Sequence, residues 1–403
     1  MLISCPIFSN DIWKTIYKCI NDREFIFLKQ GLQHTPAGLM PWEILNKAII
    51  EQRLLSPRLK LFQNGEVIPE SDYTESITEN RDSRKKIQIE KFYKLLRDEG
   101  ASLVINSVDD LHKPLTEFIC WLEESLKVPI QVNLYASFRN IKGFKSHWDT
   151  HDVLVLQLYG NKNWTIFGET NKYPLYPPKE SDVPPSKPIW NGMLNEGDIL
   201  YIPRGYWHHA EGDNNSSLHL TIGIHRKTGV DYFDWIKNQL LTEELFRKDI
   251  PLKNKTNDLH HHSEKLRQIL LQVLDEKGLE KFLDAEESKN QRRQPLGLPF
   301  AVQEEIFKES FDKYVLRVPK FILKNILIEN NSLYLKYSNK TWEFSKKCLP
   351  FFEKLRDNLE EDLTTLIETF ENSGHNSILK FIKDLIYHGI ITVHYKNINS
   401  EIK

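Results

Sequence analysis

Hydrophobic and polar positions divide the chain into three parts with different spacing. Before residue 130, apolar residues at helical spacing alternate with short extended runs. This pattern predicts helices at 42–50, 87–97 and 115–127, and strands at 24–28, 58–63 and 101–106. Pro41 suits the first turn of the first helix, and Asn64-Gly65 is typical of a hairpin turn after the second strand.

The middle part, from 130 to 226, is rich in short runs of β-branched and aromatic residues. Strands are predicted at 131–136, 153–159, 163–167, 199–202 and 218–225. Short strands joined by glycine and proline turns, with few helices between them, favour an antiparallel barrel or jelly roll. The proline-rich stretch from Tyr173 to Pro188 is expected to form a loop over the mouth of that barrel.

From about residue 230 the spacing becomes helical, with helices predicted around 233–241 and 266–273. The run His260 to His262 lies between them. A histidine run can bind metal, but the polar neighbours favour a solvated surface turn in a connector. Farther on, strands at 321–325, 332–337 and 390–395 and helices at 350–358, 363–370 and 377–388 favour a small winged-helix module.

The composition narrows the class of protein. A length of 403 residues suggests two or three domains, and a net charge of −2 gives no overall attraction to nucleic acid or anionic membranes. The four cysteines are widely spread without a C-x-x-C pair, which fits a reducing compartment. Because we find no apolar run of membrane-spanning length and no signal peptide, we expect a cytoplasmic protein with no membrane partner.

Candidate chemistry is concentrated in the β-rich middle. His147-Trp148-Asp149 is an H-x-D triplet, and a second segment, Gly197 to His209, ends in two histidines after a Pro-x-Gly turn. On a strand, His147 and Asp149 would point to one face and Trp148 to the other. His208 can approach from a neighbouring strand. Two histidines and one carboxylate on one face of an octahedron leave positions open for a cosubstrate and dioxygen, as in non-heme Fe(II) oxygenases.

With these two segments, the chain resembles the cupin-type JmjC oxygenases, and within them the ribosomal oxygenases and their bacterial relatives. The resemblance implies an α+β fold with a double-stranded β-helix core of the jelly-roll or cupin type, a helical segment and a C-terminal winged-helix domain. The domains would be 1–228, 229–300 and 301–403, with the helical segment pairing two subunits into a homodimer. The family uses Fe(II), 2-oxoglutarate and dioxygen to hydroxylate side chains of proteins.

The resemblance also assigns roles to single residues. His147, Asp149 and His208 match the iron ligands, with His208 preferred to His209 by its spacing from the Pro-x-Gly turn. His209 is then a residue of the pocket rim. Lys162 matches the cation that pairs with the distal carboxylate of 2-oxoglutarate, and its face is shared with Trp164 and Ile166. Asn133 matches a polar position in the pocket, and His219 and Thr221 are placed as cosubstrate contacts on the opposite strand.

The function that this reading implies is hydroxylation of a polypeptide side chain, on a ribosomal or another protein. Tyr206, Trp207 and Trp190 are interpreted as exposed aromatics beside the metal, where they would suit an extended peptide. The alternative, above all for Trp207, is that these rings belong to the core of the barrel. Two alternatives stay open: the same chemistry on RNA or a small metabolite, and a metal-binding cupin without catalysis, which would have no use for Lys162. Residues 301–403 carry 15 basic and 15 acidic residues, so no duplex-DNA partner is expected.

Overall fold

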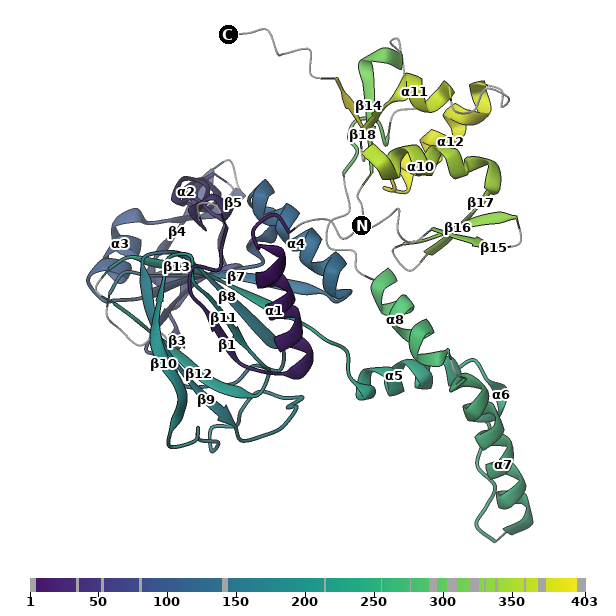
Figure 1. Cartoon of the computed structure of the whole chain (residues 1–403), viewed down its shortest axis with the longest axis horizontal. Helices are drawn as coiled ribbons and strands as arrows, with labels where there is room; N and C mark the ends of the chain where they lie inside the picture. The colour runs from purple at the N-terminus through teal and green to yellow at the C-terminus, as the bar shows by residue number, and fades with distance from the viewer. Residues whose placement is uncertain are drawn as a thin grey trace. The chain divides into compact units, whose positions relative to one another are not determined.

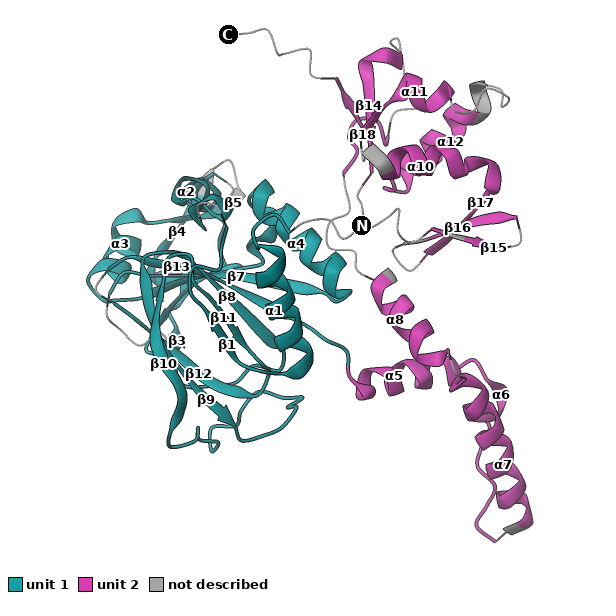
Figure 2. Ribbon diagram, viewed as in Figure 1, with its two compact units in different colours: residues 1–227 teal, residues 228–403 magenta. Residues whose placement is uncertain are grey.

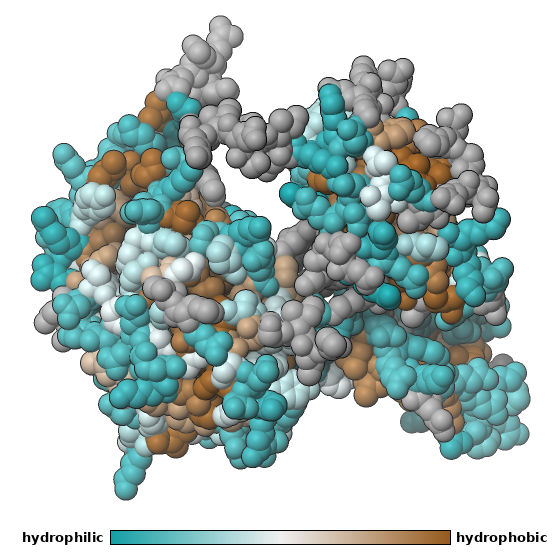
Figure 3. Space-filling view, turned by 45° about the horizontal axis from the view of Figure 1, so that its top comes forward, coloured by the Kyte–Doolittle hydropathy of each residue, from teal (hydrophilic) through white to brown (hydrophobic). Residues whose placement is uncertain are grey.

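The computed structural model describes residues 5–33, 36–51, 54–79, 82–139, 144–213, 215–254, 256–275, 277–289, 296–302, 311–318, 326–329, 331–337, 340–358, 360–368 and 375–396. By its internal contacts the chain divides into two compact units, residues 1–227 and 228–403 (Figure 2). On the face drawn in Figure 3, hydrophilic residues cover much of the surface, and hydrophobic residues reach it in patches between them.

Two antiparallel sheets form the centre of the first unit (Figure 1). The strands of the larger sheet are β1 (Ile26–Leu28), β2 (Leu59–Gln63), β3 (Glu66–Val67), β6 (Ser102–Asn106), β7 (Ile130–Ser137), β8 (Asp152–Tyr159), β11 (Ile199–Ile202) and β13 (Ser217–Ile224), in the spatial order β1-β11-β8-β13-β7-β6-β2-β3. The smaller sheet contains β9 (Asn161–Glu169), β10 (Pro188–Asn195) and β12 (Tyr206–Gly212), with β9 in the middle. The predicted antiparallel jelly-roll core is confirmed.

Apolar residues of β8 alternate between two hydrophobic cores, which explains why its sequence is an unbroken apolar run. Val153 and Val155 point between the two sheets, where they join Trp164 and Ile166 of β9 and Leu200 of β11. The residues that alternate with them, Leu154 and Leu156, belong to a larger hydrophobic core on the outer face of the large sheet. A strand that is buried on both faces gives a continuous hydrophobic run in the sequence.

Helices cover that outer face. The unit contains α1 (Asn10–Asp22), α2 (Trp42–Ile50), α3 (Ile89–Arg97), α4 (Lys113–Leu126) and the hairpin of β4 (Thr74–Glu79) and β5 (Asp82–Ile87). Ile16 of α1 and Phe118 of α4 are fully buried in the core on this side of the sheet. The N-cap of α1 is Ser9, whose side chain accepts the Ile12 N–H, and the helix ends at Arg23 in a left-handed conformation. The sequence analysis identified neither α1 nor the β4–β5 hairpin.

The second unit begins with helices and continues into a small α/β core. The helices are α5 (Gly229–Leu240), α6 (Glu244–Arg247), α7 (Thr256–Val273) and α8 (Gly278–Ser288). They are followed by β14 (Tyr314–Arg317), β15 (Ile326–Glu329), β16 (Ser332–Tyr337), β17 (Lys340–Ser345), α10 (Leu349–Asn358), β18 (Glu360–Asp362), α11 (Leu363–Glu368), α12 (His375–Tyr387) and β19 (Thr392–Tyr395). The strands form two three-stranded sheets, β18-β14-β19 and β15-β16-β17.

Several expectations about the second unit can be compared with the structure. The three helices near the C-terminus lie where the pattern placed them, and Gly389 follows the last one with a φ of 67°. The interpretation of His260 to His262 as a turn in a connector is wrong, because these residues belong to α7. The strand expected at 321–325 lies outside the described residues. No helix among the described residues is long and apolar enough to span a membrane.

Candidate metal centre

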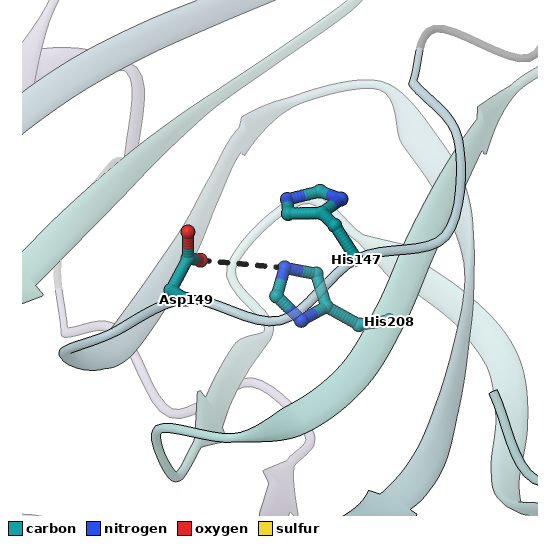
Figure 4. A group of neighbouring side chains, drawn as sticks. All are labelled: His147, Asp149 and His208. Carbon is teal, nitrogen blue, oxygen red and sulfur yellow. Dashed lines mark ion pairs between the residues drawn. The ribbon is translucent and has the colours of Figure 1, made fainter. Parts of the chain in front are cut away.

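The H-x-D segment and strand β12 meet through their main chains. His147 donates its backbone N–H to the carbonyl of His208 (3.1 Å), and His208 returns the bond (2.8 Å). This bridge brings the side chains of His147, Asp149 and His208 to one place (Figure 4), with one ligand atom from each within 4.8 Å of the others. The triplet thus forms an isolated bridge and not the regular strand expected from sequence, yet it presents the two predicted side chains to one side.

Backbone carbonyls fix the orientation of both imidazole rings. The Nδ1 of His147 lies 2.9 Å from the carbonyl of Lys145, and the Nδ1 of His208 lies 3.0 Å from that of Tyr206. A proton on each Nδ1 satisfies these contacts and leaves both Nε2 atoms available to a metal. The Nε2 of His208 lies 3.5 Å from a carboxylate oxygen of Asp149.

The protonation states of these groups suit metal binding. Burial, together with His147, lowers the pKa of His208 to about 4, although Asp149 opposes the shift. For Asp149, burial alone would raise the pKa, but His208 and His147 lower it below its usual value. Near neutral pH, His208 is therefore a neutral imidazole and Asp149 a carboxylate, the forms in which these residues ligate metals.

His209 alternates with His208 along β12 and has its partners outside this group. His209 lies 2.9 Å from the hydroxyl of Ser146 and 3.8 Å from the carboxylate of Glu211. Trp148 packs edge to face on Trp207 behind the ligands, with ring centroids 4.6 Å apart. The structure therefore brings His208, and not His209, to the other two candidate ligands.

Lys162 enters the space between the two sheets from the beginning of β9. Only 5% of its surface is exposed, and burial lowers its pKa to about 8. No acidic partner of this ammonium group is found among the described residues. Burying a cation without a counter-charge is costly, so this position is suited to an anionic ligand.

Beside Lys162 lie two more polar groups that the described residues leave unsatisfied. The Nδ1 of His219 and the indole nitrogen of Trp164 are buried without a hydrogen-bond partner in the described part of the chain. The two rings meet edge to face, with their centroids 5.4 Å apart. Burial, together with the positive charge of Lys162, lowers the pKa of His219. An ammonium group and two ring nitrogens around one buried space could together bind a carboxylate.

Asn133 and Thr221 face each other in register across β7 and β13. Asn133 accepts a bond from the backbone of Ser107 (3.3 Å). Tyr135, two residues farther along β7, was missed in the sequence analysis. Its ring stacks on His219 with centroids 5.1 Å apart, and burial and the charge of Asp149 raise its pKa well above the usual range. Its spacing from Asn133, which puts both on one face of the strand, is the signal that could have identified it.

The interpretation of exposed aromatics beside the metal is wrong in detail. Trp207 is 1% exposed, and Trp190 is half-buried against Phe25 and Phe27, with centroids 5.7 and 5.2 Å away. A strand position adjacent to a ligand does not distinguish an exposed ring from one that fills the core. The strongly exposed aromatic side chain of this region is that of Tyr176, at 78%, in the loop between β9 and β10.

Comparison with known protein families matches the JmjC domain over residues 112–232. Among characterised proteins, the bifunctional lysine-specific demethylase and histidyl-hydroxylase NO66 of Brugia malayi is 34% identical over 123 residues, which cover 29% of this chain and 17% of that protein. Human ribosomal oxygenase 1 is 31% identical over 152 residues, covering 35% of this chain and 23% of its own length. The chain thus spans about a fifth of the length of these relatives.

Solved structures give a likeness over nearly the whole chain. Escherichia coli ribosomal oxygenase YcfD aligns with a TM-score of 0.60 at 15% identity, covering 98% of this chain and 100% of that one. YcfD in complex with cobalt and 2-oxoglutarate aligns with a TM-score of 0.60 at 16% identity, covering 96% and 99%. At such low identity the likeness concerns the fold. The matched family segment also contains the complete His-Asp-His group, so over this segment the chain is similar to JmjC domains, among them those of the ribosomal oxygenases.

Proposed function

We propose that the protein is an Fe(II)- and 2-oxoglutarate-dependent oxygenase. The observation that carries the proposal is the pairing of two sites in one barrel: a His-Asp-His group and, on the neighbouring strand, the buried cation of Lys162 with no acidic partner among the described residues. A metal-binding scaffold would need the first site only. The second is what a dicarboxylate cosubstrate requires, because its distal carboxylate must be paired when it is buried.

Each residue of the barrel then has a definite task. His147, Asp149 and His208 hold the metal and leave part of its coordination sphere open. Lys162 pairs with the distal carboxylate of 2-oxoglutarate, and His219, Trp164 and Tyr135 enclose it. Asn133 and Thr221 line the same space. With iron and 2-oxoglutarate bound, the centre would supply oxidising power from dioxygen, and the protein's part is ligation and positioning.

The substrate that we favour is a polypeptide side chain. The similar proteins are called ribosomal oxygenases and a histidyl-hydroxylase, and this supports a protein target for the present chain. The β9–β10 loop adds exposed apolar side chains of Leu175, Tyr176 and Val183, which an extended peptide could contact. RNA, a small metabolite and a lysine-methyl group remain alternatives, which the experiment below distinguishes.

The second unit suits assembly. Its helices and the segments that join them leave many apolar side chains exposed in the single chain: Val230, Phe233, Leu241, Ile250, Leu252, Leu271, Leu279 and Leu283. We propose that they are covered in a homodimer and that residues 301–403 form a winged-helix domain for docking, without affinity for duplex DNA because their net charge is zero. Light scattering of the full chain should give twice the mass of 47.5 kDa. A monomer at micromolar concentration would contradict the dimer.

The central test is turnover of 2-oxoglutarate in the presence of Fe(II) and candidate substrates. Succinate should form, its rate should rise with a polypeptide substrate, and mass spectrometry should find an added 16 Da on that polypeptide. Stimulation by RNA or a free amino acid alone would favour those substrates, and formaldehyde release from methylated peptides would indicate demethylation. Metal binding without any succinate formation, even with peptide and RNA libraries, would leave only the scaffold hypothesis.

A further inference from the structure

Two tryptophans lie directly behind the candidate ligands. Trp148 stands between His147 and Asp149, and Trp207 precedes His208, so strand-like alternation turns both rings to the side opposite the metal centre. The rings are 3% and 1% exposed and meet at an interplanar angle of 81°. The two segments that carry the candidate ligands therefore contact each other in two ways: through the main-chain bonds between His147 and His208, and through the packing of Trp148 on Trp207.

The indole N–H groups of both tryptophans donate to one segment of the chain. Trp207 donates to the hydroxyl of Thr170 (2.7 Å), and Trp148 donates to the backbone carbonyl of Tyr176 (3.1 Å). These acceptors are the two ends of one segment, residues 170–176, which begins the loop between β9 and β10. We call it the rim segment. A buried indole N–H costs free energy when it lacks an acceptor, so both bonds hold the rim segment in one place.

A turn next to the ligands also contacts the rim segment. Gly205, with a φ of 87°, donates its N–H to the carbonyl of Asp149 (3.0 Å). A Cβ at this glycine would lie 2.8 Å from the Pro174 ring and 3.0 Å from the Asn171 carbonyl. The rim segment therefore packs so closely on the turn that only glycine fits.

Arg23, the C-cap residue of α1, also contacts the rim segment. The guanidinium of Arg23 lies over the ring of Tyr173, 4.0 Å from its centroid, and donates to the carbonyl of Arg204 (3.0 Å) and the carboxylate of Glu169 (2.9 Å). The rim segment is thus linked to every chain segment that carries a candidate ligand, while Tyr176 at its end is largely exposed.

We propose that Trp148 and Trp207 are positioning residues that couple the metal centre to the rim segment. Because the same two rings hold the ligand segments and the rim segment, a metal that fixes the ligands also restricts the rim segment. Coupling between two sites is reciprocal, so loosening the rim segment weakens metal binding by the same factor. This inference rests on the proposed function only in requiring that the His-Asp-His group binds a divalent metal. If the coupling exists, metal binding orders the rim segment before a substrate binds.

The test compares hydrogen exchange of the full chain with and without Mn(II), a divalent ion that does not oxidise under assay conditions. In the wild type, Mn(II) should slow amide exchange across residues 170–176. Thr170→Val removes the acceptor of Trp207 without changing the volume of the side chain, and Trp207→Phe removes the donor. Both should weaken the Mn(II)-dependent slowing by about three- to tenfold, the effect of one net hydrogen bond. Mn(II) affinity measured by calorimetry should fall by a similar factor.

Thr165→Val is the matched control, because Thr165 accepts a 2.7 Å bond from Asn191 on the same sheet and is not the acceptor of either tryptophan. It should leave the Mn(II)-dependent slowing intact. Thr170→Val keeps the proposal testable if Trp207→Phe does not fold. If calorimetry shows that Mn(II) is bound but the rate of amide exchange in residues 170–176 does not change, the proposed coupling is wrong and the proposed function is unaffected. No Mn(II) binding at all would overturn both, and the calorimetry reveals that case separately.

Discussion

The inner and outer faces of the small sheet both carry buried or half-buried polar side chains, but these side chains differ in their partners. On the outer face, Thr165 and His209 have partners within the chain: Thr165 accepts from Asn191, and His209 lies at hydrogen-bond distance from Ser146. On the inner face, the indole nitrogen of Trp164 is buried without a hydrogen-bond partner, and the buried Lys162 has no acidic partner, among the described residues. The difference teaches that burial of a polar group does not by itself mark a binding site. Burial without a partner is more informative where several such groups lie together, because single unpartnered atoms also occur elsewhere among the described residues, for example at Gln88 and Thr364.

The largest expected effect is a difference in turnover between variants of two adjacent histidines, His208 on the inner face and His209 on the outer face. His208→Ala removes a candidate ligand and should lower 2-oxoglutarate turnover by at least about a thousandfold, since a site with two ligands no longer holds the metal in the required geometry. His209→Ala should keep both metal and turnover. Calorimetric titration with Mn(II) measures the first property and succinate formation the second. If His209→Ala loses the metal and His208→Ala keeps it, the assignment of the ligand is reversed.

The next effect concerns the inner cation. Lys162→Ala should weaken 2-oxoglutarate binding by about 3–5 kcal/mol, the usual cost of removing one partner of a buried charge pair. Mn(II) affinity should stay nearly constant, because Lys162 is not a ligand. Lys91→Ala is the control for a general effect of removing a positive charge, because Lys91 is exposed and lies far from Lys162 in the sequence. An unchanged affinity for 2-oxoglutarate in Lys162→Ala would remove the lysine from the cosubstrate site.

The apolar positions of the two faces should differ in stability. Ile166 points into the closed core between the sheets and is fully buried, so Ile166→Ala should cost about 2–5 kcal/mol in the free energy of unfolding. Phe167 is half-buried on the outer face beside His209, and Phe167→Ala should cost about 1 kcal/mol. Urea denaturation of the two variants measures both values. Equal losses would mean that the outer face is as closely packed as the inner one.

The smallest effect is a pH dependence. The pKa of Lys162 is lowered to about 8 by burial, and a bound carboxylate would raise it again. Cosubstrate binding is then accompanied by proton uptake above pH 8. Affinity for 2-oxoglutarate should be constant below that pH and fall as the pH rises through it, by at most about tenfold per unit. Lys162→Arg stays protonated in this range, so any binding that it retains should not fall there.

The sequence predicted the site better than its surroundings. Alternation along a strand predicted that His147 and Asp149 share one side, whereas the choice of His208 and the role of Lys162 came from the resemblance to the JmjC oxygenases. The structure brings the three candidate ligands together. Exposure could not be predicted in this way. Trp207 and Tyr176 are both aromatic and near the site, but one is buried and the other is largely exposed, since tertiary packing decides this.

Errors elsewhere have different origins. Helix α1 was missed although its sequence carries the usual signals, since Ser9 is a good N-cap and the apolar residues Ile12, Ile16 and Ile20 recur at helical spacing. His260 to His262 appeared to be a connector because polar residues surround them, yet a helix that is largely exposed needs few apolar positions.

The pair of main-chain bonds between His147 and His208 has a practical consequence. Side-chain replacement cannot break these bonds, because every residue except proline offers the same backbone N–H and carbonyl. A variant that lacks one imidazole ring therefore keeps the frame that held the ring, together with an empty space of the ring's size. Free imidazole added to His208→Ala would find its place already shaped, and chemical rescue of a lost ligand becomes a way to study this centre without refolding it.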